Sequence, residues 1–245
     1  LAAINGSAEM IKLFLDHGAD PNAPLSQTGD TPLMIAARTG LAEAVTVLLD
    51  ANADVNPRES WGGGTALMYA VSEGHRNVAA ILIQEGAEVD ARTAFIPRNT
   101  GRGLRFEGLP PRARLPDEIG PQIHTSGEMT PLLITAREGH LDTVRLMIES
   151  DADINARAAD GKDALSLAIY NGNYAVASLL VDSGADLNQA DAMGFTALFW
   201  AVDRRNMETA PNFPWIITED PLPLVRQLLD AGADPNIIIN ETPKA

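Results

Sequence analysis

Apolar residues recur at helical spacing in two kinds of short segment along this chain. The first kind is rich in Ala and follows a tripeptide such as Thr31-Pro32-Leu33. The second kind follows a Gly and places Val, Leu, Met and Ile on one helical face. These residues are Val45, Leu48 and Leu49; Val78, Ile81 and Leu82; Val144, Leu146, Met147 and Ile148; Val176, Leu179 and Leu180; Val225, Leu228 and Leu229. A pair of helices of this length cannot enclose its own apolar face, so several pairs must stack and share one continuous core.

Six copies of one tripeptide indicate six repeats. The copies are spaced by 34, 34, 65, 33 and 48 residues. Three intervals therefore show a unit of 33 to 34 residues, and two carry inserts of roughly 32 and 15 residues. We expect one domain, 1-245, with repeats near 1-24, 25-58, 59-92, 127-157, 158-190 and 191-240. The copies are Gly18-Ala19-Asp20, Asn52-Ala53-Asp54, Gly86-Ala87-Glu88, Asp151-Ala152-Asp153, Gly184-Ala185-Asp186 and Gly232-Ala233-Asp234.

A helix start is predicted about 11 residues after most of these tripeptides. Thr or Asp at the N-cap accepts a bond from an otherwise unpaired amide, and Pro at the first helical position loses no needed donor. The helices are predicted to end near Gly40, Gly74, Gly139 and Gly172, because Gly suits the left-handed position after a helix. The five starts are at Thr31, Thr65, Thr130, Asp163 and Thr196.

The combined pattern resembles the ankyrin repeat. Thr-Pro-Leu, two Ala and Gly-His are followed by Val, Leu-Leu and Gly-Ala-Asp-x-Asn, best in residues 29–56 and 127–155. The resemblance covers about 1–92 and 127–236, and its recurrence at the right period makes it specific. It implies an all-α solenoid of stacked helix-turn-helix units with β-hairpin-like fingers. It also implies binding of other proteins through the concave face and the fingertips.

The chain departs from this family at one position. Ankyrin repeats usually have His directly after Thr-Pro-Leu, and the hydrogen bonds of that His are therefore expected to be replaced by apolar packing here. The first unit begins midway through a helix, so we expect the chain to be part of a longer array. The residues in place of His are Met34, Met68, Leu133, Ser166 and Phe199.

The first insert, 93-126, is rich in Pro, Gly and Arg. Long loops in a compact repeat array are usually functional or disordered. Six of the 18 basic residues of an otherwise acidic chain lie in or next to this insert. They could recognise an acidic partner, because Arg pairs bidentately with carboxylates and stacks on aromatic rings. They could equally lie across the acidic solenoid and neutralise it. The residues concerned are Arg92, Arg98, Arg102, Arg105, Arg112 and Arg114, with Phe95 and Phe106.

The second insert, near 207-223, has Trp215 as its expected anchor. The indole could present an aromatic contact to a partner, since Trp is enriched at binding hot spots. Alternatively, it packs back on the last repeat and shields an apolar helix face.

The resemblance places further candidate contacts on the concave helices and the fingertips. Trp61, beside three Gly residues, is the preferred single contact. Tyr69 and Trp200 replace an aliphatic residue of the motif, and packing between repeats is the alternative role for them. The concave candidates are Arg38, Tyr69, Ser72, Arg137, Tyr170, Trp200, Asp203 and Arg204, and the fingertip candidates are Arg58, Glu59, Ser60 and Trp61.

The composition narrows the classes of partner. The net charge of -15 disfavours nucleic acid and anionic membranes over most of the surface. No apolar run approaches the ~18 residues that cross a bilayer. The absence of Cys fits a reducing cytosol and an oxidising periplasm equally well. The repeats resemble those of bacterial ankyrin proteins, many of them exported, which favours the periplasm over the cytoplasm.

No catalytic motif is present, and an enzyme is not expected. The four His do not cluster: His75 and His140 follow a helix-ending Gly, His17 precedes Gly18, and His124 alone lies outside the pattern. The recurring Asp residues are expected to bond backbone amides in turns. No cofactor is expected. The first hypothesis is a scaffold that binds another protein; the alternatives are a structural subunit of an assembly and a small-ligand or metal site around 93-126.

Overall fold

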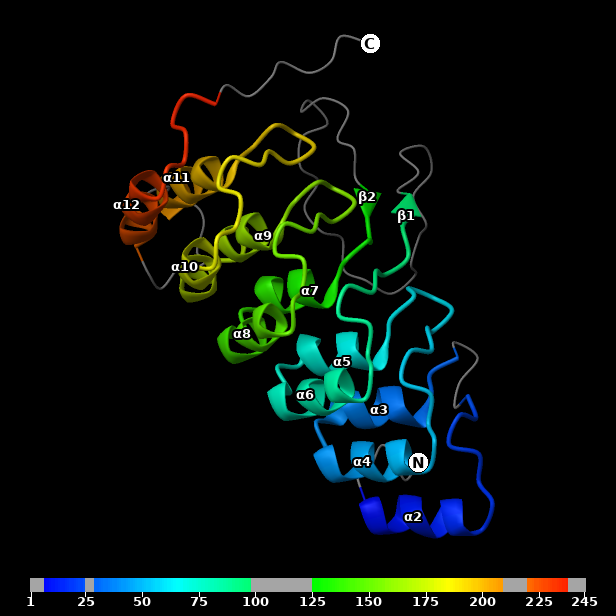
Figure 1. Cartoon of the computed structure of the whole chain (residues 1–245). Helices are drawn as coiled ribbons and strands as arrows, with labels where there is room; N and C mark the ends of the chain where they lie inside the picture. Colours follow the sequence, from blue (N-terminus) through cyan, green and yellow to red (C-terminus); the bar gives the residue numbers. More distant parts are fainter. Residues whose placement is uncertain (1–6, 25–28, 98–124, 209–219, 238–245) are drawn as a thin grey trace.

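The computed structural model describes residues 7–24, 29–97, 125–208 and 220–237 (Figure 1). These ranges contain eleven helices and one pair of two-residue strands. The expected all-α class is confirmed. The helices are α2 (Ala8–Asp16), α3 (Pro32–Thr39), α4 (Ala42–Asp50), α5 (Ala66–Ser72), α6 (Arg76–Gln84), α7 (Pro131–Glu138), α8 (Leu141–Glu149), α9 (Ala164–Tyr170), α10 (Tyr174–Asp182), α11 (Ala197–Glu208) and α12 (Leu222–Asp230); the strands are β1 (Ile96–Pro97) and β2 (Thr125–Ser126).

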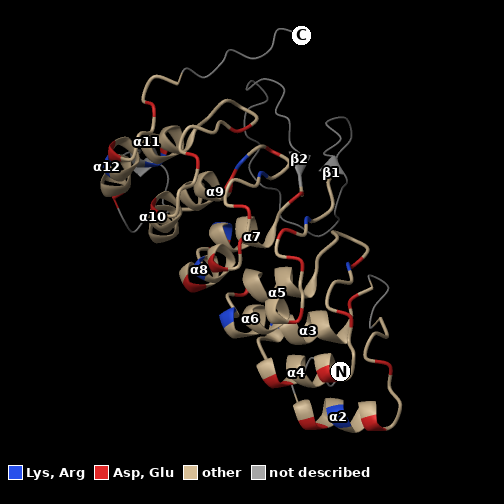
Figure 2. Ribbon diagram, viewed as in Figure 1, with Lys and Arg blue, Asp and Glu red and all other residues tan. Residues whose placement is uncertain are grey.

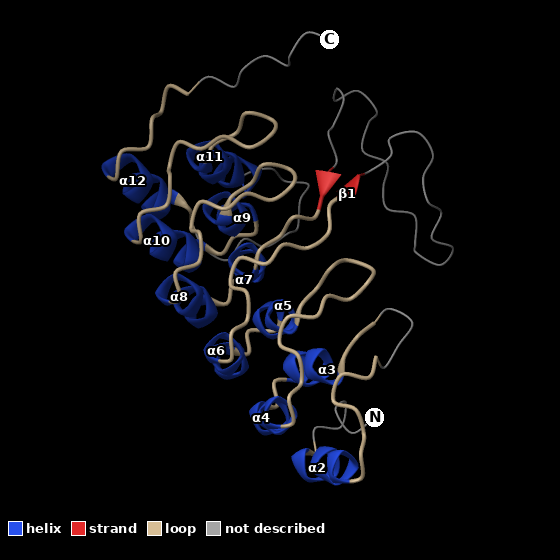
Figure 3. Ribbon diagram, turned by 45° about the vertical axis from the view of Figure 1, so that its right-hand side comes forward, coloured by secondary structure: helices blue, strands red, loops and turns tan. Residues whose placement is uncertain are grey.

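The helices form two rows that run side by side along the stack (Figure 1). The outer row is α2, α4, α6, α8, α10 and α12, and the inner row is α3, α5, α7, α9 and α11. Each helix packs on its neighbours in its own row, and each inner helix also packs on the outer helix that follows it in the chain. The inner row lies between the outer row and a set of projecting loops (Figure 3). We call the surface of the inner row and these loops the inner face; it corresponds to the expected concave face.

Small residues let the inner helices approach one another closely. The same position of each inner helix holds Ala or Thr, and each of these side chains is fully buried. A larger side chain there would have to displace a closely packed neighbour. These residues are Ala36, Ala70, Thr135, Ala168 and Ala201.

The inner helices begin where the sequence predicts. The Oγ1 atoms of Thr31, Thr65 and Thr130 each accept a hydrogen bond from the amide three residues later, at 3.3 Å. Asp163 does the same at 2.7 Å and Thr196 at 3.4 Å. Apolar burial at the position that is His in other ankyrin repeats is also confirmed for three of the units, since the side chains of Met34, Met68 and Leu133 are buried.

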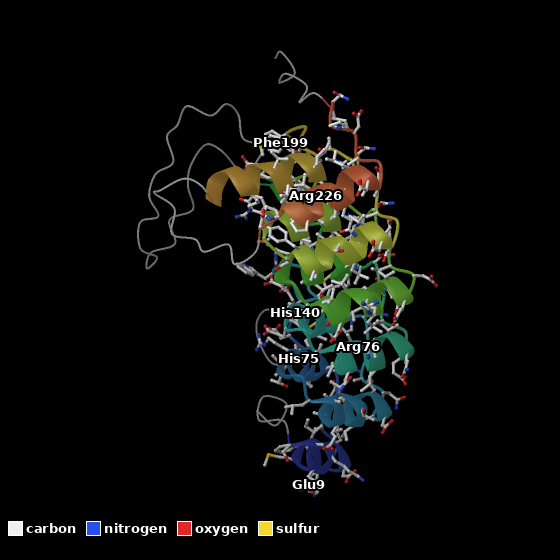
Figure 4. All side chains as sticks on the ribbon, turned by 90° about the vertical axis from the view of Figure 1, so that its left-hand side faces the viewer. Glu9, His75, Arg76, His140, Phe199 and Arg226 are labelled. Carbon is white, nitrogen blue, oxygen red and sulfur yellow. The ribbon has the colours of Figure 1, made fainter. Side chains whose placement is uncertain are left out.

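In three of the units a polar side chain binds the C-terminal end of the preceding inner helix. His75 donates from Nε2 to the carbonyl of Arg38 at 3.1 Å, and His140 donates in the same way to Ser72 at 3.0 Å. Figure 4 shows these two His one above the other along the stack. In the next unit Asn173 takes this role, and its Nδ2 donates to the carbonyls of Ala136 and Arg137 at 3.1 and 2.8 Å. These bonds satisfy carbonyls that a helix end leaves unpaired.

Asn and Asp side chains form a second set of bonds between neighbouring units. Each accepts a hydrogen bond from a backbone amide of the next unit, and Asp90 continues the series across the insert-bearing interval. The first and second inserts therefore interrupt the sequence period but not this series. The bonds run from the amides of Asp54, Glu88, Asp153, Asp186 and Asp234 to Asn22, Asn56, Asp90, Asn155 and Asn188, over 2.7 to 3.1 Å.

The projecting loops are hairpin-like fingers, as the resemblance implies. The finger at Ala158 closes by a bond from its amide to the carbonyl of Lys162 at 2.9 Å, and Asp191 and Phe195 form the equivalent bond at 2.9 Å. Adjacent fingers are joined, because the amide of Ala192 donates to the carbonyl of Asp160 at 3.0 Å. β1 and β2 pair antiparallel where the first insert leaves and rejoins the stack. The division of 1-245 into six repeats stays a prediction.

Gly139→Ala tests the polar bond between units. Gly139 has φ 87°, and an added Cβ would lie 2.5 Å from Oδ1 of Asn173. We expect the free energy of unfolding to fall by about 1 kcal/mol because Ala is strained in the left-handed backbone. The disturbed Asn173 bonds should lower it by roughly 1–2 kcal/mol more. The measurement is the free energy of unfolding from urea titration.

Gly172→Ala is the matched control for this variant. Gly172 has φ 79°, and an added Cβ would meet nothing within 4 Å. It should therefore lose only the backbone contribution. Equal losses in the two variants would contradict a stabilising role of the Asn173 bonds.

Candidate functional site

The sequence-predicted residues of the inner face differ in exposure. Arg38, Arg137 and Tyr170 are exposed, and the Tyr170 side chain keeps 41% of its surface accessible. Trp200 is only 6% exposed, so its ring packs in the core and supports its neighbours. Ser72, Tyr69, Asp203 and Arg204 are half-buried.

Three aromatic rings gather around that of Trp200, at the end of the stack formed by α9 and α11. The rings of Phe195 and Phe199 stack in parallel with centroids 4.1 Å apart. Both meet the Trp200 ring edge-on, at 5.2 and 5.6 Å. Tyr170, on the neighbouring inner helix, meets Trp200 edge-on at 5.0 Å. These geometries suit the charge distribution of aromatic rings. We call Tyr170, Phe195, Phe199 and Trp200 the aromatic platform.

Two cations lie against this platform. The Nζ atom of Lys162, from the finger before α9, is 5.7 Å from the centroid of Tyr170 and 5.5 Å from that of Trp200. The Cζ atom of Arg204, from α11, is 4.9 Å from the centroid of Tyr170. Cations within about 6 Å of a ring face are attracted by its electrons. Tyr170 is therefore contacted by a cation from its own unit and by one from the next.

Asp191 ties the last finger to the platform. Its Oδ1 accepts from the amides of Met193 and Phe195 at 2.9 and 3.0 Å, and its Oδ2 accepts from Nε1 of Trp200 at 3.3 Å. Nζ of Lys162 lies 3.8 Å from the same Oδ2 and 2.9 Å from Oδ2 of Asp160. The charges of the buried Asp191 carboxylate and the half-buried Lys162 ammonium group thus compensate each other.

A smaller cluster forms around Tyr69. Its hydroxyl donates to Oδ1 of Asp30 at 3.3 Å, and Cζ of Arg38 lies 5.8 Å from its ring centroid. Burial raises the pKa of Tyr69, and the negative charges of Asp30 and Glu59 raise it further against the opposing effect of Arg38. The hydroxyl therefore remains a hydrogen-bond donor at neutral pH.

The finger before α5 exposes Trp61. The Glu59 carboxylate is buried in this finger and accepts from the amides of Trp61, Gly62 and Gly64 at 2.6, 2.7 and 2.9 Å. The Trp61 side chain is 79% exposed, as expected for a fingertip. The buried carboxylate thus fixes the backbone while the indole projects into solvent.

Two arginines, Arg58 and Arg92, join one finger to the next. Arg58 donates to the carbonyl of Arg92 and pairs with Glu88 at 3.2 Å. Arg92 in turn donates to the carbonyls of Glu128 and Arg157 at 3.2 and 2.7 Å. In the structure Arg58 and Arg92 therefore bridge units; a contact of Arg58 with a partner stays a prediction.

Several predicted residues lie outside the part of the chain that the structure describes. They are Arg98, Arg102, Arg105, Phe106, Arg112, Arg114, His124 and Trp215.

Within the described ranges, no group of three or more His, Asp or Glu side chains has the arrangement of a metal site. None of the helices in these ranges combines the length and the apolar character needed to cross a bilayer.

Comparison with known families identifies the repeats. A family model that describes three consecutive ankyrin repeats matches residues 1–93, 115–191 and 132–212. The chain belongs to the ankyrin repeat family. Comparison with curated proteins finds no matching relative.

Ankyrin repeats are generally protein–protein interaction modules, and proteins of this family are typically scaffolds without enzymatic activity.

Sequence reasoning missed Lys162 and Asp191. Both lie in fingers, where Lys and Asp are common surface residues. The repeated motif predicts where the fingers lie along the chain. The concentration of Phe and Trp in residues 195–200 indicates an aromatic cluster. The contacts of Lys162 come from a different unit and were not accessible from its local sequence.

Asp163 provides a pH-dependent test of this region, because it begins the helix that carries Tyr170. Burial raises the pKa of Asp163, although its bonds with Ser166 and the charge of Arg157 oppose the shift. The unfolded carboxyl therefore ionises at lower pH than the folded one. The Asp163 contribution to stability is full below its unfolded pKa and is lost as pH rises through its folded pKa.

We expect Asp163→Asn to keep the N-cap acceptor and remove this dependence. The difference in free energy of unfolding, variant minus wild type, should become more positive as pH rises from about 3 to 7. Urea titrations at several pH values give this difference. A difference that stays constant or becomes more negative would contradict the burial penalty on the carboxylate.

Proposed function

We propose that this protein is a scaffold that binds a partner protein through the inner face and the fingertips, with the Arg-rich insert 93-126 adding selectivity. The observation that carries the proposal is the aromatic platform with exposed Tyr170 and stacked Arg204 on the inner face. Tyr, Trp and Arg are the residues that dominate binding energy at protein interfaces.

The rigidity of the platform supports this proposal. Trp200 is fixed by Asp191, and Tyr170 is fixed by Trp200 and by two cations. A preformed surface loses little conformational entropy when a partner binds. Binding would therefore retain most of the free energy gained from the contacts.

Trp61 supports a second contact area at the fingertips. A Trp side chain that is 79% exposed contributes little to the stability of the unbound chain. Its backbone is nevertheless fixed by the buried Glu59 carboxylate. This combination suits a contact residue, since the indole would lose solvent only in a complex.

Affinity capture from native extract tests the proposal. The bait would be the wild-type chain, and three variants would remove one surface each: Tyr170→Ala with Arg137→Ala, Trp61→Ala, and Ala at Arg102, Arg105, Arg112 and Arg114. We expect a partner that the wild type captures and the first variant loses, because hot-spot truncations cost about 2 kcal/mol or more, roughly a thirtyfold loss of affinity.

Arg145→Ala with Arg226→Ala is the matched control, because it removes exposed charges from α8 and α12 of the outer row. Circular dichroism would establish that all variants are equally folded. Capture that is equal for the wild type and all three surface variants would contradict the proposed surfaces. Absence of any specific partner would contradict the scaffold function itself.

A further inference from the structure

Arg204 has no paired acid among the described residues, although the protein is strongly acidic. The chain has a net charge of -15, and acidic residues outnumber basic ones along the ribbon (Figure 2). Even so, no carboxylate of the described residues lies within 4.0 Å of the Arg204 guanidinium. Its Nε is buried and has no hydrogen-bond partner. Buried polar groups without partners are rare in folded proteins and call for a specific explanation.

The other cations of this part of the inner face are already paired. Arg137 bonds Glu138 at 2.7 Å. Lys162 lies between Asp160 and Asp191, and little of its side chain is exposed. Arg204 therefore differs from its neighbours, because its charge is not compensated by a nearby described acid.

The position of Arg204 leaves its outer nitrogens available. The side chain is half-buried, with its guanidinium against the Tyr170 ring. Of its three guanidinium nitrogens, only Nε is both buried and unbonded, so the two Nη groups, which have no hydrogen bond either, keep contact with solvent. Their N–H groups can therefore donate to a ligand.

We propose that Arg204, held against Tyr170, anchors a carboxylate of the partner protein; this inference rests on the proposed function. A guanidinium stacked on an aromatic ring is fixed in orientation, and its planar set of donors matches the two oxygens of a carboxylate. Tyr170 and the buried Trp200 exclude water on one side, which strengthens the pairing.

The net charge limits what kind of segment carries this carboxylate. A segment with many acidic residues would be repelled by the acidic surface as a whole. A single Asp, Glu or C-terminal carboxylate beside an apolar residue avoids this repulsion, and the apolar residue can pack on the exposed part of Tyr170. The partner segment is therefore a mainly apolar peptide with one carboxylate.

Selection from a random synthetic dodecapeptide library tests this inference. The full chain would be immobilised, and bound peptides would be sequenced by mass spectrometry from two libraries, one with free and one with amidated C-termini. We expect selected peptides to have a single carboxylate next to an apolar residue. Selection only from the free library would assign it to the C-terminus, and selection from both would assign it to Asp or Glu.

A double-mutant cycle on one selected peptide then tests the pairing. Arg204→Gln should weaken binding about tenfold or more, and the peptide with its carboxylate replaced by the amide should lose a similar factor. The two changes together should cost little more than either alone, since they remove the same contact. Arg204→Lys should restore only part of the affinity, because it keeps the charge without the planar donors.

Arg226→Gln is the matched control, since it removes the same charge from α12 (Figure 4). It should leave the dissociation constant unchanged. Additive losses, or selected peptides that bind equally well as amides, would overturn the inference and leave the scaffold function intact. Selected peptides whose binding requires Trp61 and not Arg204 would also overturn the inference and leave the scaffold function intact. Failure of the wild type to select any peptide would also count against the inference, whereas the scaffold function is decided separately by the capture experiment.

Discussion

The stack depends on hydrogen bonds that cross from each helix pair to the next. His75, His140 and Asn173 bind the end of the preceding inner helix. Asn and Asp side chains accept hydrogen bonds from backbone amides of the following unit. Apolar burial alone favours stacking but fixes neither rotation nor sliding of one pair on another, because it has no preferred direction. These directional bonds select one arrangement, and the small Ala residues between the inner helices permit the close approach that the bonds require.

The inner face follows from this constraint, since its important groups come from different units. Tyr170 lies on α9, while Trp200 and Arg204 lie on α11, and the platform exists only when these helices have a fixed relative position. The backbone of two fingers is fixed within each finger, through the buried carboxylates of Glu59 and Asp191. A surface that is already ordered before binding is suited to recognise another folded or extended chain at low entropic cost.

Much of this fold was predictable because it repeats. The period, the N-caps at Thr31 and Thr130 and the left-handed Gly positions are local features, and six imperfect copies reinforce one another. The roles of Trp200 and Arg58 were less accessible. Trp200, for which packing between repeats was the alternative role, is buried against Asp191, and Arg58 bonds the next finger. A contact of either residue with a partner stays a prediction. These outcomes depend on which residues the neighbouring units bring near, and a single unit's sequence does not contain that information.

Hydrogen exchange of the backbone amides tests most directly whether the bonds between units fix the stack. The amides of Asp54, Glu88, Asp153, Asp186 and Asp234 all lie in loops and donate to a side chain of the preceding unit. The account predicts that these five loop amides exchange about as slowly as amides within the inner helices, since both open only when neighbouring units separate. Exchange at the rate of solvent-exposed loop amides would contradict it, because the units would then be held by apolar packing without these bonds.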